Sequence, residues 1–388
     1  MSEPPAISRL TRGLRHGLGT DTGQRAIVPP WYPSTNYSFD DLGQPGGDYD
    51  YGRTNNPTRS LVAEALATLE GGAGCVFTSS GMSAASLAVL ALVPTGGRVV
   101  ATHDLYGGTW RLLERFSDQS RLTVDFVDLT DLDLAGAALQ RPVDLLWVET
   151  PSNPLLRISD VRALADLGHA AGATVLVDNT FCSPLLQQPL DLGADLVMHS
   201  ATKFINGHSD VIAGALVSRD VALHDDLSAW ANTLGVTGSS FDAWLTLRGL
   251  RTLEVRQRVH EQNALAVVDL LRQHPAVSAV HHPSQVEHPG HEVAVRQQSG
   301  FGSLVSLDLH AGRDAASTVV RNLHCFDLAE SLGGVESLVA HPSSMTHAAM
   351  PPEVQAAAGI TPGLLRLSVG IEPVADLLAD LRHALDQI

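Results

Sequence analysis

The sequence predicts an α/β protein: a larger part with a mostly parallel sheet sandwiched by helices, and a smaller C-terminal α+β domain. Two observations favour this fold class. The 388 residues are enough for two or three domains with a large buried core. Short, nearly continuous apolar runs alternate with amphipathic helical patterns up to about residue 245. Such runs are typical of parallel strands that helices cover on both faces.

Residues 1–55 lack this alternation and are rich in Pro, Gly, Tyr and Asp, as in VPPWYPSTNYSFDDLGQPGGDYDYGR. A segment of this composition has no periodic apolar face to bury, so we expect residues 1–55 to form an extended arm. The first residues, MSEPPAISRLTRGLRHGL, contain no apolar stretch followed by a small-residue cleavage site, so no signal peptide is expected.

Residues 56–245 are expected to form the larger domain. Helical patterns occur in TRSLVAEALATLE, SGMSAASLAVLALV and GTWRLLERFS. The predicted strands, in chain order, are GCVFT, RVVAT, LTVDFV, DLLWVE, TVLVD, DLVMH and IAGALV. Because these strands are short and largely apolar, the sheet should be mostly parallel and buried between helices.

Residues 246–388 are expected to form the smaller domain. A long helical pattern with a break at Gly249 leads into it, from SFDAWLTLRGL to VVDLLRQ. A strand (SLVSLDL), a helix (DAASTVVRNL), a strand (LLRLSVG) and a closing helix (VADLLADLRHAL) follow. No low-complexity linker divides the chain, so we expect the two domains to pack against each other.

Composition excludes several classes of function. The formal net charge is −17 and no basic cluster occurs, which argues against nucleic acid or an anionic membrane as a partner. No apolar run approaches transmembrane length. Cys75, Cys182 and Cys325 are odd in number and far apart, which indicates reduced thiols in a cytoplasmic protein rather than a disulfide framework.

Lys203 is the only lysine of a chain in which Lys and Arg together number 25. A coding preference for Arg explains why lysine is scarce, but it does not explain why the single remaining lysine is at position 203. Arg replaces Lys wherever only a solvated charge is needed, but not where an amine must lose its proton and attack a carbonyl. Lys203 is therefore a candidate Schiff-base lysine.

Asp178 ends the predicted strand TVLVD, and Lys203 follows the next predicted strand, DLVMH. One strand–helix–strand step would bring both residues to the same edge of the sheet, where ligands bind in open parallel sheets. An Asp at a strand end is also commonly a turn or helix cap, so this residue does not identify a site by itself.

Groups suited to a phosphate lie nearby in the sequence pattern. Ser200 and Thr202 flank the lysine, and Gly81 and Met82 open a predicted helix whose free N–H groups could bind an anion. Tyr106 could supply an aromatic face for a ring. An amine, a carboxylate and a phosphate-binding helix start together suggest pyridoxal phosphate as the cofactor.

Several motifs resemble, in order, those of the Cys/Met-metabolism PLP-dependent enzyme family. DNTF followed by HSATKFINGHSD is similar to the family signature. Further blocks resemble the family as well: YGRTNNPT, SGMSA, DLYGGT, ETPSNP, AESLGGVESL and LRLSVGIE. The match runs from about residue 10 to the end of the chain. It implies the PLP-dependent transferase-like fold, fold type I.

The resemblance implies a role for each cofactor residue. Lys203 would bind the cofactor covalently and carry protons, and Asp178 would pair with the ring nitrogen. Tyr106 would stack on the ring, with Asn153 near its hydroxyl. Four residues would hold the phosphate: Gly81, Met82, Ser200 and Thr202.

The resemblance also implies a shared active site. Tyr51 and Arg53 on the arm would reach the phosphate of a neighbouring subunit, so the active unit would be at least a dimer, and family members are typically tetramers. Arg366 would hold the substrate α-carboxylate as a two-pronged clamp, assisted by Ser331. The expected set of substrate contacts also includes Asp50, Tyr51, Arg111 and Glu330.

Within the family, GVTGSSFD, RQQSGFG and MTHAAMPPEVQAAAGI are most similar to the branch that carries out γ-replacement. That branch joins an O-acylhomoserine to L-cysteine and forms cystathionine, in transsulfuration and methionine biosynthesis. Lys203 would take the α-proton and then move the proton that lets the acyl group leave. O-Succinylhomoserine is the expected ester, with Arg111 as the candidate contact for its free carboxylate. Thr54 stands where related enzymes carry a basic residue, so acetyl and phospho esters remain alternatives.

Two alternative functions are supported by the residues to different degrees. The γ-lyase branch of the family, which splits cystathionine, remains the alternative because it shares Glu330 and every cofactor residue. A non-catalytic nucleotide- or metal-binding protein is disfavoured, since no G-x-G-x-x-G follows the first strand and no P-loop occurs. The His-rich stretch HHPSQVEHPGH has no acidic or Cys ligand set to complete it, so no metal site is expected.

Overall fold

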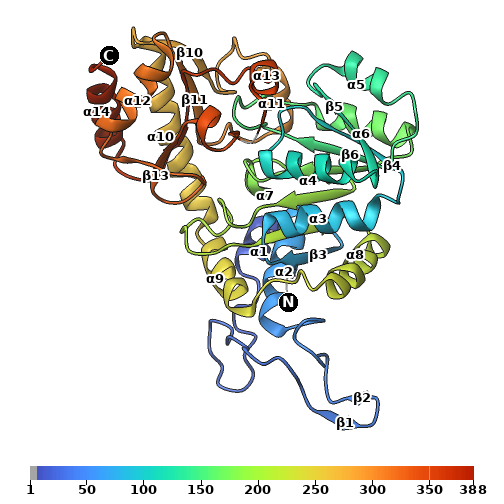
Figure 1. Cartoon of the computed structure of the whole chain (residues 1–388). Coiled ribbons are helices and arrows are strands. Elements are labelled where there is room, and N and C mark those ends of the chain that lie inside the picture. Colours follow the sequence, from blue (N-terminus) through green and yellow to red (C-terminus); the bar gives the residue numbers. More distant parts are fainter. Residues whose placement is uncertain (1–6, 349) are drawn as a thin grey trace.

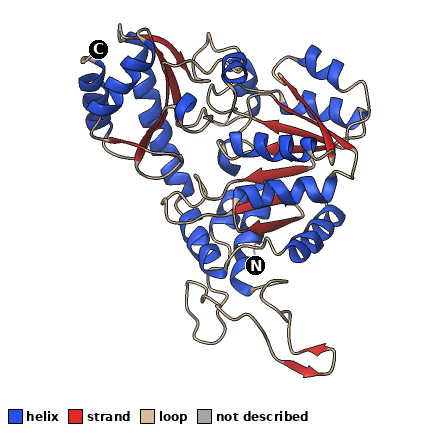
Figure 2. Cartoon of the chain, viewed as in Figure 1, coloured by secondary structure: helices blue, strands red, loops and turns tan. Residues whose placement is uncertain are grey.

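The computed structural model describes residues 7–348 and 350–388, and within them it contains a seven-stranded sheet, a five-stranded sheet and a small hairpin. Helices cover both faces of the larger sheet, and a long arm projects from the side where the chain begins (Figure 1). Figure 2 shows the same layers by secondary structure. The expected fold class is confirmed: an α/β part with a mostly parallel sheet, followed by a smaller α+β part.

The seven-stranded sheet has the order β3-β9-β8-β7-β6-β4-β5. Its strands are β3 (Gly74–Thr78), β4 (Gly97–Thr102), β5 (Leu122–Val127), β6 (Leu145–Glu149), β7 (Thr174–Asp178), β8 (Leu196–His199) and β9 (Gly214–Ser218). The strands from β4 to β8 pair in parallel, whereas β9 runs antiparallel to both of its neighbours. Residues 200–213 form turns instead of a crossover helix, so the chain returns beside β8 in the opposite direction.

Alternate residues of β6 explain why this sheet is buried on both faces. Leu145 and Trp147 point into one apolar core, and Leu146 and Val148 point into another. Helices on the first face include α3 and α4, and helices on the second face include α5 and α6. The helices of this part are α2 (Pro57–Glu70), α3 (Gly81–Leu92), α4 (Gly107–Asp118), α5 (Leu132–Ala138), α6 (Val161–Ala170), α7 (Ser183–Leu186) and α8 (Val221–Leu234).

The five-stranded sheet has the order β10-β11-β14-β13-β12 and is mixed, with β12 and β13 as its parallel pair. Its strands are β10 (Val277–His281), β11 (Leu304–Leu309), β12 (Phe326–Leu328), β13 (Ser337–Ala340) and β14 (Leu364–Ser368). The accompanying helices are α9 (Ser240–Leu250), α10 (Leu253–Gln273), α11 (His291–Gln297), α12 (Gly312–Asn322), the 3₁₀ turn η1 (Pro342–Ser344), α13 (Pro352–Ala357) and α14 (Val374–Leu385). None of the helices described is long and apolar enough to span a bilayer.

The break expected at Gly249 lies slightly further along the chain. Gly249 is inside α9, and the interruption before α10 falls at Arg251 and Thr252. A Cβ at Gly249 would collide with the backbone carbonyl of Asn206. The glycine is therefore explained by a close approach of two backbones rather than by a helix end.

The arm is only partly extended, so the expectation for residues 1–55 is wrong for their first described part. Helix α1 (Arg9–Leu14) packs on α2, and a Cβ at its buried Gly13 would collide with Leu69. From about residue 20 the chain is mostly exposed and projects away from the sheets, with β1 (Phe39–Asp41) and β2 (Gln44–Pro45) near its tip (Figure 1). Residues 1–6 lie outside the described part.

Candidate active site

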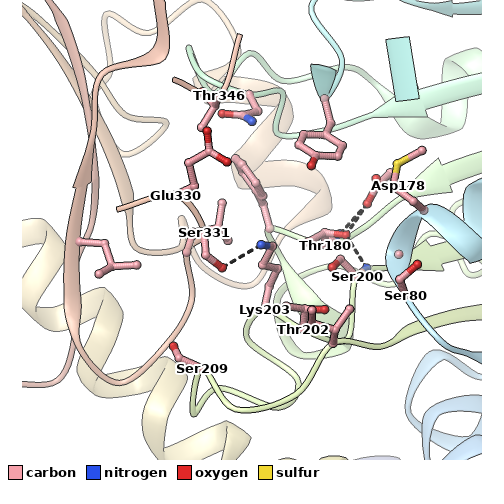
Figure 3. A pocket seen from close by; sticks show the side chains of 18 of the residues that line it. Ser80, Asp178, Thr180, Ser200, Thr202, Lys203, Ser209, Glu330, Ser331 and Thr346 are labelled. Carbon is pink, nitrogen blue, oxygen red and sulfur yellow. Dashed lines mark hydrogen bonds between the residues drawn. The ribbon is translucent and has the colours of Figure 1, made fainter. Parts of the chain in front are cut away.

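A cavity of about 830 Å³ lies where strands β6, β7 and β8 end, and it is closed on its other side by segments of the C-terminal part. It brings together most of the site residues predicted from the sequence: Gly81, Met82, Tyr106, Arg111, Asn153, Asp178, Ser200, Thr202, Lys203, Glu330, Ser331 and Arg366. Figure 3 shows Lys203 near the centre of this group, with side chains from both parts of the chain around it.

The amine of Lys203 is held by the C-terminal part. Its Nζ donates a hydrogen bond to Ser331 Oγ at 2.8 Å (Figure 3). Burial and the positive charge of Arg366 lower the pKa of Lys203 to about 8, although Glu330 opposes this change. Ser331 itself has a φ of 101°, in the region that side chains rarely adopt, which is common where a functional group must be aimed.

Asp178 is joined to Ser200 through Thr180. The Asp178 carboxylate accepts hydrogen bonds from the Thr180 N–H at 3.0 Å and from its hydroxyl at 2.6 Å. Thr180 Oγ1 in turn accepts from the Ser200 N–H at 2.9 Å (Figure 3). Burial raises the pKa of Asp178, and the Thr180 hydrogen bonds oppose the rise. A cationic ring nitrogen beside this buried carboxylate would stabilise its charged form.

The start of α3 forms a cradle for an anion beside Ser200. Ser80 caps the helix by accepting from the Ser83 N–H, which leaves the N–H groups of Gly81 and Met82 at the positive end of the helix. A Cβ at Gly81 would lie 3.0 Å from both Cβ and Oγ of Ser200, so a side chain there would fill the cradle. These donors fit a phosphate group.

Thr202 lines the same cavity but its hydroxyl has protein partners. Oγ1 donates to the Ala213 carbonyl at 3.1 Å and accepts from the Ala213 N–H at 3.0 Å. This pair of hydrogen bonds closes the loop between β8 and β9. In this structure Thr202 therefore holds the loop that carries Lys203. Its hydroxyl proton is used in the hydrogen bond to the Ala213 carbonyl, whereas its oxygen keeps one lone pair for a further hydrogen bond.

Arg366, on β14, presents a buried and oriented guanidinium. Nη1 donates to Asn153 Oδ1 at 2.8 Å and Nη2 donates to the Ser331 carbonyl at 2.9 Å, while Nε has no partner among the described residues. Burial lowers the pKa of Arg366 to about 10, so the group stays charged near neutral pH. A cavity-lining, partly unpaired guanidinium is suited to a carboxylate ligand.

Tyr106 is the residue before α4 and is 43% exposed. A Cβ at Gly108 would collide with its ring and would lie 2.8 Å from Met82 Sδ, so glycine lets the ring lie back against the helix start. Arg111, one turn further along α4, and Glu330 both line the cavity, and neither forms an ion pair among the described residues.

The arm residues are not part of this cavity within one chain. Tyr51 is half exposed, and the guanidinium of Arg53 lies 5.5 Å from the centre of its ring. Arg53 donates to the side chain of Asn232 at 2.6 Å, and Asp50 accepts from the Tyr51 N–H. None of Asp50, Tyr51 and Arg53 lines the cavity that holds Lys203.

Thr180 and Glu149 are among the lining residues that were missed from the sequence. Thr180 lies inside the DNTF motif, and Glu149 opens ETPSNP directly at the end of a predicted strand, so strand-end position was the available signal. The histidines of residues 281–291 have separate partners, such as Asp308 for His281 and the Pro283 carbonyl for His291. Among the described residues, no group of three His, Cys, Asp or Glu side chains is arranged to hold a metal.

Comparison with known proteins adds to this geometry. Residues 11–386 match the family model described as Cys/Met metabolism PLP-dependent enzyme. A cystathionine gamma-synthase of Escherichia coli (strain K12) is 48% identical over 373 residues, which cover 96% of each chain. A cystathionine gamma-lyase of Dictyostelium discoideum is 42% identical over 387 residues, covering 100% of both. A crystal structure of cystathionine gamma synthase from Xanthomonas oryzae pv. oryzae in complex with cystathionine has a TM-score of 0.97, 53% identity and 99% coverage of both chains.

Proposed function

The chain belongs to the Cys/Met metabolism PLP-dependent enzyme family, and we propose that it joins an O-acylhomoserine to L-cysteine to form cystathionine, a step of methionine biosynthesis. Its cofactor is pyridoxal phosphate. The observation that carries the proposal is one cavity in which a buried guanidinium with a free donor, on Arg366, lies beside the only lysine. The 48% identity to a curated cystathionine gamma-synthase supports the same reaction.

The described residues fit the cofactor. When bound, pyridoxal phosphate supplies an aldehyde for an amine and a ring that accepts electrons from the substrate carbon. Lys203 would hold it covalently, and Asp178 would face its ring nitrogen. The start of α3, with Ser200 beside it, would hold the phosphate, and Tyr106 would cover the ring.

Lys203 is also the proposed proton carrier. Its lowered pKa, about 8, leaves a useful fraction of the amine neutral near neutral pH, so it can accept a proton from the substrate α-carbon. The bond to Ser331 fixes the amine at the side of the cavity that Arg366 also faces. After it has passed this proton on, the same amine can remove a proton from the β-carbon, and the electron pair released there expels the γ-acyloxy group as a carboxylate.

Arg366 is proposed to select the substrate by its α-carboxylate. Its orientation is set before binding by Asn153 and the Ser331 carbonyl, so little rearrangement is needed when a carboxylate arrives. Asn153 is then a positioning group for Arg366 as well as a neighbour of the cofactor. Cysteine, the second substrate, would enter the part of the cavity lined by Glu330 and Thr346.

We propose O-succinylhomoserine as the ester, with Arg111 as the contact for its free carboxylate. Arg111 lines the cavity and has no ion-pair partner among the described residues, so its charge is available to a ligand. Thr54 brings no second positive charge from the arm. The acetyl ester carries no carboxylate at that end, and the phospho ester carries a stronger negative charge there. The choice among the three esters is therefore testable.

The active unit is proposed to be at least a dimer, in a tetramer of the family type. Arg53 and Tyr51 are exposed and lie outside their own chain's cavity, which is what a contribution to a neighbouring subunit's phosphate requires. Among the described residues, the phosphate cradle at the start of α3 and Ser200 has no positively charged side chain besides the neighbouring Lys203. A guanidinium from a neighbour would supply that charge.

A second candidate, cystathionine γ-lyase activity, is favoured by the 42% identity to the Dictyostelium discoideum lyase along the whole chain.

Purified enzyme should be given cysteine with the succinyl, acetyl and phospho esters in turn, and separately cystathionine alone, with cystathionine and 2-oxobutanoate both measured. Cystathionine formed fastest from the succinyl ester supports the proposal. Faster 2-oxobutanoate release from cystathionine would establish the lyase instead.

The Arg111 assignment has its own check in the same assay. Arg111→Ala should raise KM for the succinyl ester about 10-fold and leave KM for the acetyl ester nearly unchanged, because only the first ester carries the extra carboxylate. An equal change for both esters would place the succinyl carboxylate elsewhere.

A further inference from the structure

Glu149 is a buried carboxylate of the cavity to which the proposed reaction gives no role. It is the last residue of β6, is 5% exposed and lines the cavity that contains Lys203. Its backbone is paired with that of Asp178 on the neighbouring strand, so two carboxylates stand side by side at the same edge of the sheet. Burial raises the pKa of Glu149 well above its usual range, and the charge of Asp178 adds to the rise. Such a costly group needs a structural or chemical reason.

Glu149 caps a helix from a distance. Helix α4 begins after Tyr106, whose side chain forms no capping hydrogen bond, and the first turn of α4 contains no acidic residue. Glu149 Oε2 accepts the backbone N–H of Tyr106 at 2.7 Å. This hydrogen bond fixes the point at which α4 begins and from which the Tyr106 ring projects.

The same carboxylate reaches a second loop. The backbone N–H of Asn153, like that of Tyr106, favours the charged form of this carboxyl and lowers its pKa against the effect of burial. Asn153 Oδ1 then accepts from Arg366 Nη1 at 2.8 Å. One buried side chain thus links the residue proposed to cover the cofactor ring to the residue that orients the substrate-binding guanidinium.

We propose that Glu149 is a positioning residue that sets Tyr106 and Asn153 at the distance and angle the bound cofactor needs. A glutamine has the same shape but only one acceptor oxygen, and its NH₂ would face one of the two N–H donors. One loop would then lose its acceptor and shift. The inference rests on the proposed contacts of Tyr106 and Asn153 with the cofactor, and not on which ester the enzyme uses.

The test compares Glu149→Gln with Asp380→Asn in the holoenzyme. Asp380, on α14, is also a buried carboxylate that accepts backbone N–H groups, those of His324 and Cys325, but it does not line the cavity. Both variants should lower the Tm. Only Glu149→Gln should change the circular dichroism of the bound cofactor, which reports ring orientation, and lower kcat about 10- to 100-fold.

Each outcome decides the matter. A cofactor dichroism band and a kcat in Glu149→Gln that match wild type, or that change no more than in Asp380→Asn, would overturn the proposal. If Glu149→Gln yields no folded holoenzyme, Glu149→Asp carries the same test, because it keeps the carboxyl group but withdraws it by one methylene. Since the dichroism is recorded without substrate, an incorrect substrate assignment leaves this result unaffected.

Discussion

The wall of the cavity and the arm are two regions that carry proposed site residues in opposite physical states. Arg366 is 2% exposed and Asp178 is 7% exposed, and both have hydrogen-bond partners in the same chain. On the arm, Leu42 is 95% exposed and Tyr51 is half exposed. The wall is therefore organised by one chain alone. The arm buries too little apolar surface to be organised alone, which is the reason for our proposal that it acts on a neighbouring subunit.

Lys203→Arg should have the largest effect on turnover, because it removes the reactive amine from the cavity wall but keeps the positive charge. We expect turnover to fall more than about 1,000-fold, since a guanidinium does not bind an aldehyde or accept the substrate proton. Borohydride treatment of the wild-type holoenzyme should fix the cofactor onto the peptide that contains residues 199–210. Wild-type turnover in Lys203→Arg, or a cofactor fixed to no peptide, would contradict the proposed role.

Arg366→Lys tests whether the wall binds substrate as well as cofactor. A point charge cannot replace a two-pronged donor, and it also loses the bonds to Asn153 and the Ser331 carbonyl. We expect KM for the homoserine ester to rise about 10- to 100-fold while the cofactor absorbance stays close to wild type. An unchanged KM would show that the α-carboxylate binds elsewhere.

The pH dependence of cofactor uptake tests the burial of the wall directly. Burial lowers the pKa of Lys203 from 10.5 to about 8, and the neutral amine is the form that attacks the aldehyde. The rate at which apoenzyme takes up pyridoxal phosphate should rise about 10-fold from pH 7 and level off above about pH 8 to 9. A rate that keeps rising to pH 10 or beyond would mean that the amine is not desolvated.

Subunit mixing tests the role of the arm, and the recovered activity is the smallest effect that we expect among these experiments. Arg53→Ala and Lys203→Ala should each be nearly inactive, whereas a mixture that exchanges subunits should regain up to about a quarter of wild-type activity. In each hybrid dimer one site has both Lys203 and the partner's arginine, and the other site has neither. No recovery in a mixture proven to exchange subunits would mean that Arg53 acts within its own chain or not at all.

Much of the fold could be predicted because its signals are local. The apolar runs of the parallel strands, the caps of the helices and the single lysine are all readable without knowing what packs against them. The elements that were not predicted include strands β10, β12 and β13 and helices α5, α6, α7, α8, α11 and α13, since their patterns are short or weakly periodic. The docking of α1 on α2 was missed for a related reason: a six-residue helix has little periodicity of its own.

By itself, the sequence determined which residues could do chemistry and in what order they occur: a lysine after one strand, a carboxylate at the end of another, and an arginine near the C-terminus. Only the tertiary structure decided how they act together. Ser331 holds the amine of Lys203, the Ser331 carbonyl and Asn153 orient Arg366, and Glu149 accepts the backbone N–H of Tyr106. These contacts join residues up to 213 positions apart. Burial shifts the pKa values in the same cavity, and burial is a property of packing that no local pattern encodes.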